Sequence, residues 1–88
     1  MCTYTTQILE VSASAKGASG WFRATSASVY VDHPVHFPAG HALMIDVLHT
    51  GGGLSGRVGL ELDAASARAL AEAILSTLDP VPAGLLEP

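Results

Sequence analysis

The chain has few charged residues and almost no cysteine. Its 88 residues include only 4 Lys and Arg against 8 Asp and Glu, which gives a formal net charge of -4. A protein that neutralises nucleic-acid phosphates needs clustered basic residues, and so does a polybasic membrane-surface module. We therefore expect no nucleic-acid partner and no membrane partner. The single cysteine, Cys2, cannot form an internal disulfide, which excludes a disulfide framework.

Long apolar runs and leader-like features are also lacking. No stretch reaches the roughly 18 consecutive apolar residues of a membrane span, and the N-terminus has no basic region followed by an apolar core. A chain with one cysteine suits a reducing compartment. We therefore expect a cytoplasmic location.

Apolar residues are abundant, at 49% of the chain, and they mark a C-terminal helix. Asp63 is a suitable N-cap, and Asp79-Pro80 ends the helix because the residue before proline avoids the helical region. These boundaries predict a single α+β domain over 1–79 and a Pro-rich flexible tail over 80–88. Apolar residues recur at the three- and four-residue spacing of an amphipathic helix: Ala67, Leu70, Ala71, Ile74, Leu75 and Leu78.

Ahead of the helix the apolar pattern has a period of two, which is typical of strands. We expect Ser12–Gly20 to be a flexible link and Thr50–Gly53 to be a hairpin turn. Short links favour antiparallel neighbours. The sequence therefore predicts an α+β fold, a four-stranded antiparallel sheet followed by one C-terminal helix (ββββα). The four strands are expected over 3–12, 21–31, 42–48 and 57–62.

The third expected strand is apolar on both faces. Met44 and Leu48 alternate with Leu43, Ile45 and Val47. One helix covers only one face of a sheet, and an exposed apolar face is a liability in a monomer. We therefore expect a homodimer that packs sheet on sheet or joins sheet edges.

Histidine is the residue type with the most chemical potential. Of the four histidines, His33, His36 and His41 lie within nine positions, on a proline-braced link and the start of the next strand. Three neutral imidazoles suit zinc above all, and also copper, iron or nickel. We therefore expect a small metal-binding protein, with enzymatic activity on a small organic molecule left open. Further candidate ligands are Asp32, Asp46, His49 and Cys2.

Two alternatives use the same residues differently. The first is a non-enzymatic dimeric module that binds a small apolar ligand or a protein partner, with Trp21 in the ligand pocket. The second is a metal-free cyclase or isomerase in which one histidine acts as general acid or base. Lys16, the only lysine, is a candidate ligand-binding residue that would contact an anion from an adjoining loop.

Three segments resemble a family of small actinobacterial proteins with no established activity. They are 1–6 (MCTYTT), 14–22 (SAKGASGWF) and 32–36 (DHPVH), and the resemblance extends to about Leu78. The resemblance implies a soluble bacterial protein and gives no mechanism.

Overall fold

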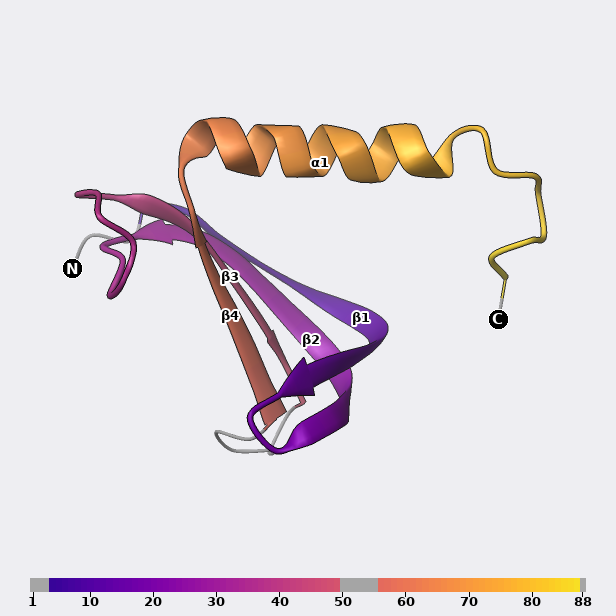
Figure 1. Ribbon diagram of the computed structural model, residues 1–88, viewed down its shortest axis with the longest axis horizontal. Helices are drawn as coiled ribbons and strands as arrows, with labels where there is room; N and C mark the ends of the chain where they lie inside the picture. The colour runs from indigo at the N-terminus through magenta and orange to yellow at the C-terminus, as the bar shows by residue number, and fades with distance from the viewer. Residues whose placement is uncertain (1–3, 50–55, 88) are drawn as a thin grey trace.

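The computed structural model describes residues 4–49 and 56–87 and shows the expected α+β order ββββα (Figure 1). The expected hairpin turn at Thr50–Gly53 and the candidate ligand Cys2 lie outside the described residues. The elements are β1 (Thr6–Gly17), β2 (Gly20–Asp32), β3 (Ala42–Leu48), β4 (Arg57–Leu62) and α1 (Ala64–Leu78).

The four strands form one antiparallel sheet in the order β1-β2-β3-β4. The register of the strands places different side chains on the two faces of the sheet. Tyr30, Met44 and Glu61 lie side by side on one face, which we call the groove face. Val31, Leu43 and Leu62 lie side by side on the other, which we call the helix-side face because α1 starts over it.

β1 is longer than the sequence predicts. The expected flexible link over Ser12–Gly20 is wrong, because Ala13–Gly17 pairs with Gly20–Ala24 and only two residues remain in the turn. Gly20 has a φ of 109°, a conformation that favours glycine. Ala13 and Ala15 alternate with Ser14 and Lys16, but alanine and glycine have a low strand propensity, so the pairing with β2 makes this segment a strand.

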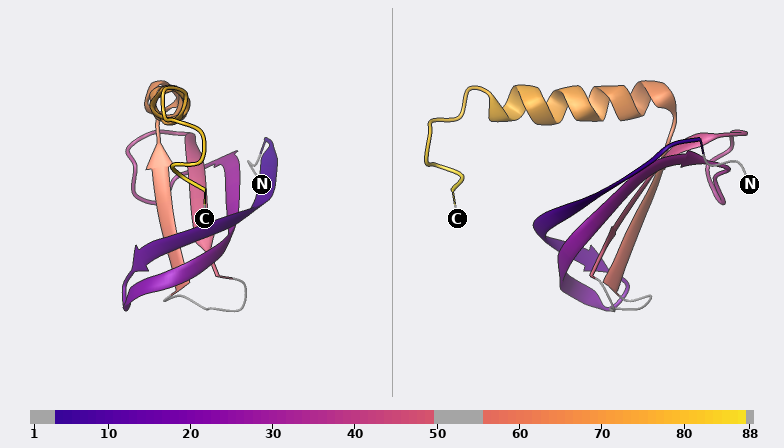
Figure 2. Two further views of the ribbon diagram at one scale, coloured as in Figure 1. Left: turned by 90° about the vertical axis from the view of Figure 1, so that its right-hand side faces the viewer. Right: turned by 180° about the vertical axis from the view of Figure 1, so that it is seen from behind.

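A β-bulge bends the β1–β2 hairpin. Between Glu10 and Ala13 the register shifts, so that two residues of β1 face one residue of β2. The far end of the hairpin therefore crosses the sheet and brings β1 next to β4 (Figure 2). Ala24, close to this bend, is fully buried.

α1 begins and ends where the sequence predicts. The Asp63 carboxylate accepts a hydrogen bond from the Ser66 N–H at 2.7 Å. The Ser66 side chain, and then this N–H, lower the pKa of Asp63. The last turn closes with the Asp79 N–H donating to the Leu75 carbonyl, directly before Pro80. In the described part of the chain, no helix is long and apolar enough to cross a membrane.

The helix leaves the sheet at an angle. It meets the helix-side face near its own N-terminal end, through Ala64 and Ala67, and then diverges from it (Figures 1 and 2). No residue of α1 is buried. Among the described residues, the buried apolar side chains are three alanines and one methionine: Ala24, Ala27, Ala42 and Met44.

Candidate functional site

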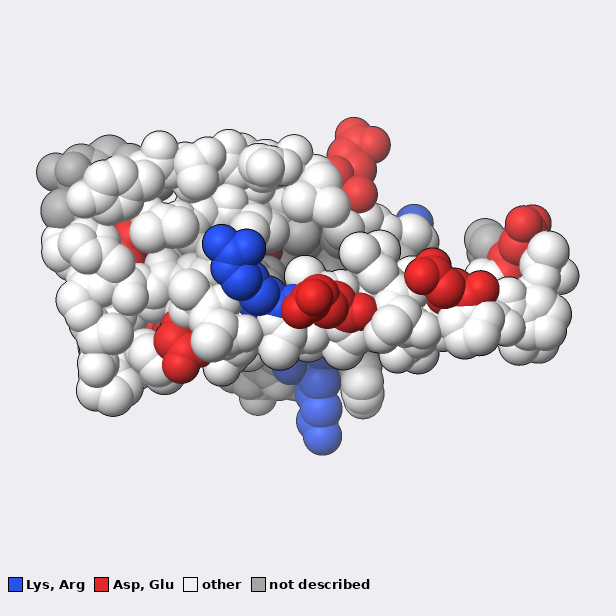
Figure 3. All heavy atoms as spheres, turned by 90° about the horizontal axis from the view of Figure 1, so that it is seen from above, with Lys and Arg blue, Asp and Glu red and all other residues white. Residues whose placement is uncertain are grey.

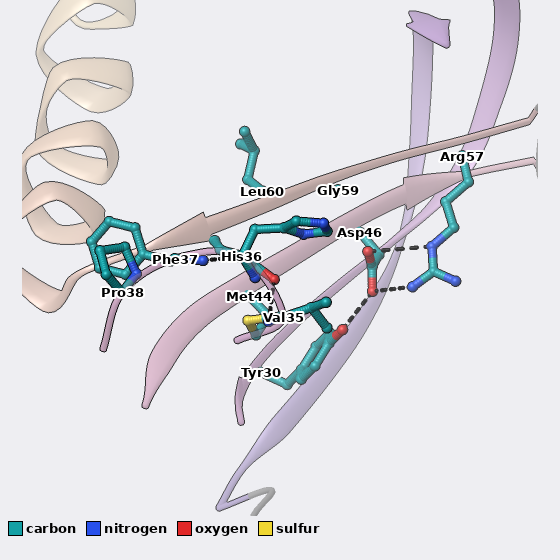
Figure 4. A pocket seen from close by; sticks show the side chains of 11 residues that line it. Tyr30, Val35, His36, Phe37, Pro38, Met44, Asp46, Arg57, Gly59 and Leu60 are labelled. Carbon is teal, nitrogen blue, oxygen red and sulfur yellow. Dashed lines mark hydrogen bonds and ion pairs between the residues drawn. The ribbon is translucent and has the colours of Figure 1, made fainter. Parts of the chain in front are cut away.

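The groove face carries an open groove of about 730 Å³ (Figure 4). One end is formed by the loop between β2 and β3, with Phe37 and Pro38, and the other end by Arg57 of β4. A concave site of this volume is large enough for a small organic molecule. Leu60 also borders the groove, but its side chain points away from it, toward the other face of the sheet (Figure 4). The other lining residues are Tyr30, Val35, His36, Met44, Asp46, Gly59 and Glu61.

Three side chains from three adjacent strands converge in the groove. The Tyr30 hydroxyl donates to Asp46 Oδ2 at 2.7 Å. Arg57 approaches the same carboxylate from the other side, with Nη2 2.9 Å from Oδ2 and Nε 3.4 Å from Oδ1 (Figure 4). The Asp46 side chain is 13% exposed and the Arg57 side chain 51% exposed. The carboxylate is therefore held at the base of the groove, while the guanidinium reaches solvent.

A glycine makes room for this arrangement. Gly59 is the register partner of Asp46 on β4. A Cβ at position 59 would lie 3.1 Å from Asp46 Oδ1, which is closer than an ordinary van der Waals contact. The absence of a side chain at Gly59 thus allows the Asp46 carboxylate to reach Arg57 across the strand.

The cluster changes the acidity of the tyrosine. The hydrogen bond to Asp46 raises the pKa of Tyr30 above its usual value, and burial and the negative charge of Asp46 raise it further. Arg57 acts in the opposite direction but is the weaker influence. Tyr30 is therefore a neutral hydroxyl at physiological pH, held as a donor to the carboxylate.

Glu61 fixes the loop at the other end of the groove. Its carboxylate accepts hydrogen bonds from three successive backbone N–H groups: Val35 at 2.7 Å, His36 at 2.9 Å and Phe37 at 2.6 Å. These bonds, the one from Val35 foremost, lower the pKa of Glu61 below its usual value. One β4 side chain thus positions the segment that carries His36 into the groove wall.

The groove combines polar groups with an apolar floor. Arg57 offers N–H donors beyond those that contact Asp46, and His36 lines the wall. Met44, which is 9% exposed, and Phe37 supply apolar contact area. This arrangement suits a molecule with an apolar body and an oxygen that accepts a hydrogen bond.

The structure separates the three candidate zinc ligands. The rings of His33 and His41 lie together, with centroids 4.5 Å apart, and His33 Nδ1 donates to the Gly40 carbonyl at 2.6 Å. His36 lines the groove, whereas His41 lines a hollow on the helix-side face. Within residues 4–49 and 56–87, no three His, Cys, Asp or Glu side chains are grouped so as to hold a metal ion.

The further candidate ligands are also dispersed. The Asp32 carboxylate accepts a hydrogen bond from the His33 backbone N–H at 2.7 Å. Asp46 belongs to the groove cluster with Tyr30 and Arg57. His49 lines a separate hollow beside Phe22.

Lys16 and Trp21 lie next to each other, away from the groove. They are register partners on β1 and β2, at the far end of the hairpin. Trp21 is 72% exposed and lines the hollow of about 320 Å³ that also contains His49. Lys16 lies in β1 rather than in a loop.

Tyr30, Arg57 and Glu61 were not singled out in the sequence. The signal for them lies in the strand register, which places Tyr30 opposite Met44, Met44 opposite Glu61, and Arg57 two pairs away from Asp46, on the same face. The spacing of histidine and cysteine along the chain does not reveal such cross-strand clusters.

Fold and site together define a small α+β protein with a single antiparallel sheet and an open groove of ligand size on one face. The chain belongs to the family of unknown function DUF6295, whose model matches residues 1–87. The expectation of a family without an established activity is thereby confirmed. No curated protein and no solved structure matches the sequence.

Proposed function

We propose that this protein binds a small, uncharged organic molecule with an apolar body and a carbonyl or hydroxyl oxygen. The observation that supports the proposal is the position of Arg57. Asp46 holds its guanidinium at the groove, and half of the Arg57 side chain stays exposed. A guanidinium fixed in this way can donate to a ligand oxygen without first being ordered. Location in the cytoplasm is part of this proposal, supported by the single cysteine.

The charges that surround the groove favour a neutral ligand. Asp46 and Arg57 compensate each other, and the Glu61 carboxylate is occupied by the three loop N–H groups. The chain as a whole carries a net charge of -4, which disfavours an anion. The floor at Met44 and Phe37 suits the apolar body.

Acetophenone, an aromatic ketone, is a suitable probe, and ethylbenzene is the matched compound without the oxygen. In amide NMR spectra we expect acetophenone to shift the signals of Asp46, Arg57 and the loop 35–37. Arg57→Gln should weaken this binding at least about tenfold, because a hydrogen bond to a charged donor contributes roughly 1.5–3 kcal/mol. Because ethylbenzene lacks the oxygen, it should bind the wild type no more tightly than acetophenone binds Arg57→Gln.

Arg23→Gln is the control, because Arg23 is exposed on β2 and lies outside the groove lining. It should leave acetophenone binding unchanged. Shifts that map to another part of the surface, or equal binding by the Arg57 variant, would contradict the proposal.

A second candidate function is metal binding through His33 and His41, supported by the contact between their rings. The Gly40 carbonyl takes the Nδ1 proton of His33, and a backbone carbonyl in this role is common behind metal-bound histidines. Zinc added to untagged protein in the same NMR experiment should then perturb residues 33 and 41. His41→Ala should abolish the effect and His36→Ala should not. Absence of a zinc effect in the wild type would exclude this function.

A further inference from the structure

The helix and the sheet form an open wedge with apolar walls. Because Ala67 lies at the hollow on the helix-side face, the apolar stripe of α1 is directed toward the sheet. The large residues of the stripe are all exposed: Leu70 by 40%, Ile74 by 53%, Leu75 by 62% and Leu78 by 48%. We use the name wedge for the space between this stripe and the helix-side face.

The opposite wall of the wedge is apolar as well. The residues that three neighbouring strands place on the helix-side face are all Ala, Val, Leu or Ile. They are Ala27, Val29 and Val31 of β2, Leu43, Ile45 and Val47 of β3, and Val58, Leu60 and Leu62 of β4. Leu60 on this wall is 46% exposed. Of the charged side chains on the helix, Glu72 lies off the stripe, whereas Arg68 lines the hollow where α1 meets the sheet. The side of the molecule that carries α1 shows scattered charges on uncharged surface (Figure 3).

The exposed area is larger than that of a compact monomer of the same mass. The chain exposes 6546 Å², whereas a monomer of 9.0 kDa exposes about 4,850 Å². The radius of gyration is 14.5 Å, against about 12 Å for a compact domain of this length. Part of the excess of about 1,700 Å² comes from the segment after Leu78. Half of the excess still matches the roughly 800 Å² that each partner buries in a standard interface.

We infer that the wedge is filled by a second copy of this chain. In this arrangement the α1 helix of each copy inserts its apolar stripe against the helix-side face of the other copy, and the two helices lie antiparallel around a two-fold axis. This pairing is more specific than the homodimer expected from the sequence, which packs sheet on sheet or joins sheet edges.

Two observations favour a second copy over an unrelated partner. Both complementary surfaces, an apolar helix stripe and an apolar sheet face, occur on the same chain and open into the same wedge, as a two-fold interface requires. Their lengths also match: the 15 residues of α1 extend about 22 Å and the 7 residues of β3 about 23 Å.

The pairing leaves the groove open. The groove lies on the other face of the sheet, with Tyr30, Met44 and Asp46, so a helix on the helix-side face does not cover it. The two proposals are therefore independent, and failure of acetophenone binding would not affect the dimer.

Sedimentation equilibrium at micromolar concentration, together with isotope-filtered NMR, tests the inference. The wild type should sediment at twice the chain mass of 9.0 kDa. In a mixture of labelled and unlabelled chains, contacts between copies should join the methyl groups of Ile74 and Leu75 to those of Ile45 and Leu60. A wild-type mass of 9.0 kDa, or inter-copy contacts only at the outer edge of β1, would overturn the inference.

Ile74→Asp places a charge in the centre of the stripe and should reduce dimer affinity at least a hundredfold. Ala69→Asp adds the same charge on the opposite side of α1 and should leave the dimer intact. Equal behaviour of the two variants would overturn the inference. If Ile74→Asp does not fold, the inter-copy contacts of the wild type alone decide the outcome.

Discussion

Asp46 is the residue on which the groove depends. It accepts from Tyr30 and pairs with Arg57, and it does so because Gly59 leaves space beside it. Removing a carboxylate that is 13% exposed would leave the Tyr30 hydroxyl without its acceptor and Arg57 without its counter-charge. The three side chains therefore act as a unit, and changes to them will not be additive.

Asp46→Asn should lower the pKa of Tyr30, because the hydrogen bond to the Asp46 carboxylate is the main cause of its elevation. Alkaline titration of phenolate absorbance in a Tyr4→Phe background measures this change directly. Glu72→Gln removes a charge from α1 and should leave the titration unchanged. An unaltered titration of Asp46→Asn would contradict the assigned hydrogen bond.

The same pKa elevation has a consequence for stability. A raised pKa in the folded state means that ionisation of Tyr30 opposes folding. The neutral hydroxyl therefore makes its full contribution to the free energy of unfolding below the usual tyrosine pKa. This contribution is lost as the pH rises through the raised pKa.

At the scale of elements, Glu61 holds the β2–β3 loop through three backbone N–H groups. Because the pKa of Glu61 is lowered, its carboxylate contributes to the free energy of unfolding above the usual glutamate pKa. This contribution is lost as the pH falls through the lowered pKa. We expect the amide signals of Val35, His36 and Phe37 to shift together during acid titration, with a midpoint below that of an unperturbed glutamate.

Glu61→Gln should abolish this shared titration and speed hydrogen exchange at the three amides. Glu10→Gln is the matched control, since Glu10 is an exposed residue of β1, and it should leave the loop signals unchanged. If the loop amides of the Glu61→Gln variant titrate as they do in the wild type, another group holds the loop.

The elements differ in how far the sequence specifies them. α1 is predicted to within a few residues, because Asp63, the apolar stripe and Pro80 are local signals. The second half of β1 is missed, because its small residues become a strand only by pairing with β2. The site follows the same division: the loop histidines are visible in the sequence, whereas Tyr30, Asp46 and Arg57 meet only through strand register.

At the scale of the whole molecule, one sheet carries two different surfaces. The groove face holds the polar cluster, and the helix-side face together with the stripe of α1 forms the wedge. Three alanines and one methionine are a small core for the described chain. Folding of an 88-residue chain requires much more buried apolar area to offset its conformational entropy, and a second copy would supply it.

Thermal stability should therefore depend on protein concentration. Each tenfold dilution changes the free energy of a dimer by about 1.4 kcal/mol, which lowers Tm by about 3–6 °C for a unit of twice this length. Calorimetry over a hundredfold range of concentration measures the slope. Ala69→Asp should retain it, and a Tm independent of concentration in the wild type would contradict folding coupled to assembly.

The position of α1 after the four strands affects how the protein is made. The sheet is synthesised first and emerges from the ribosome with its apolar helix-side face open, since the element that would cover this face in a neighbouring copy is translated after the four strands. In the proposed dimer, a nascent sheet cannot exchange helices until α1 of both chains has been translated. Aggregation during synthesis then competes with pairing, so the yield of folded protein depends on how quickly newly finished chains meet.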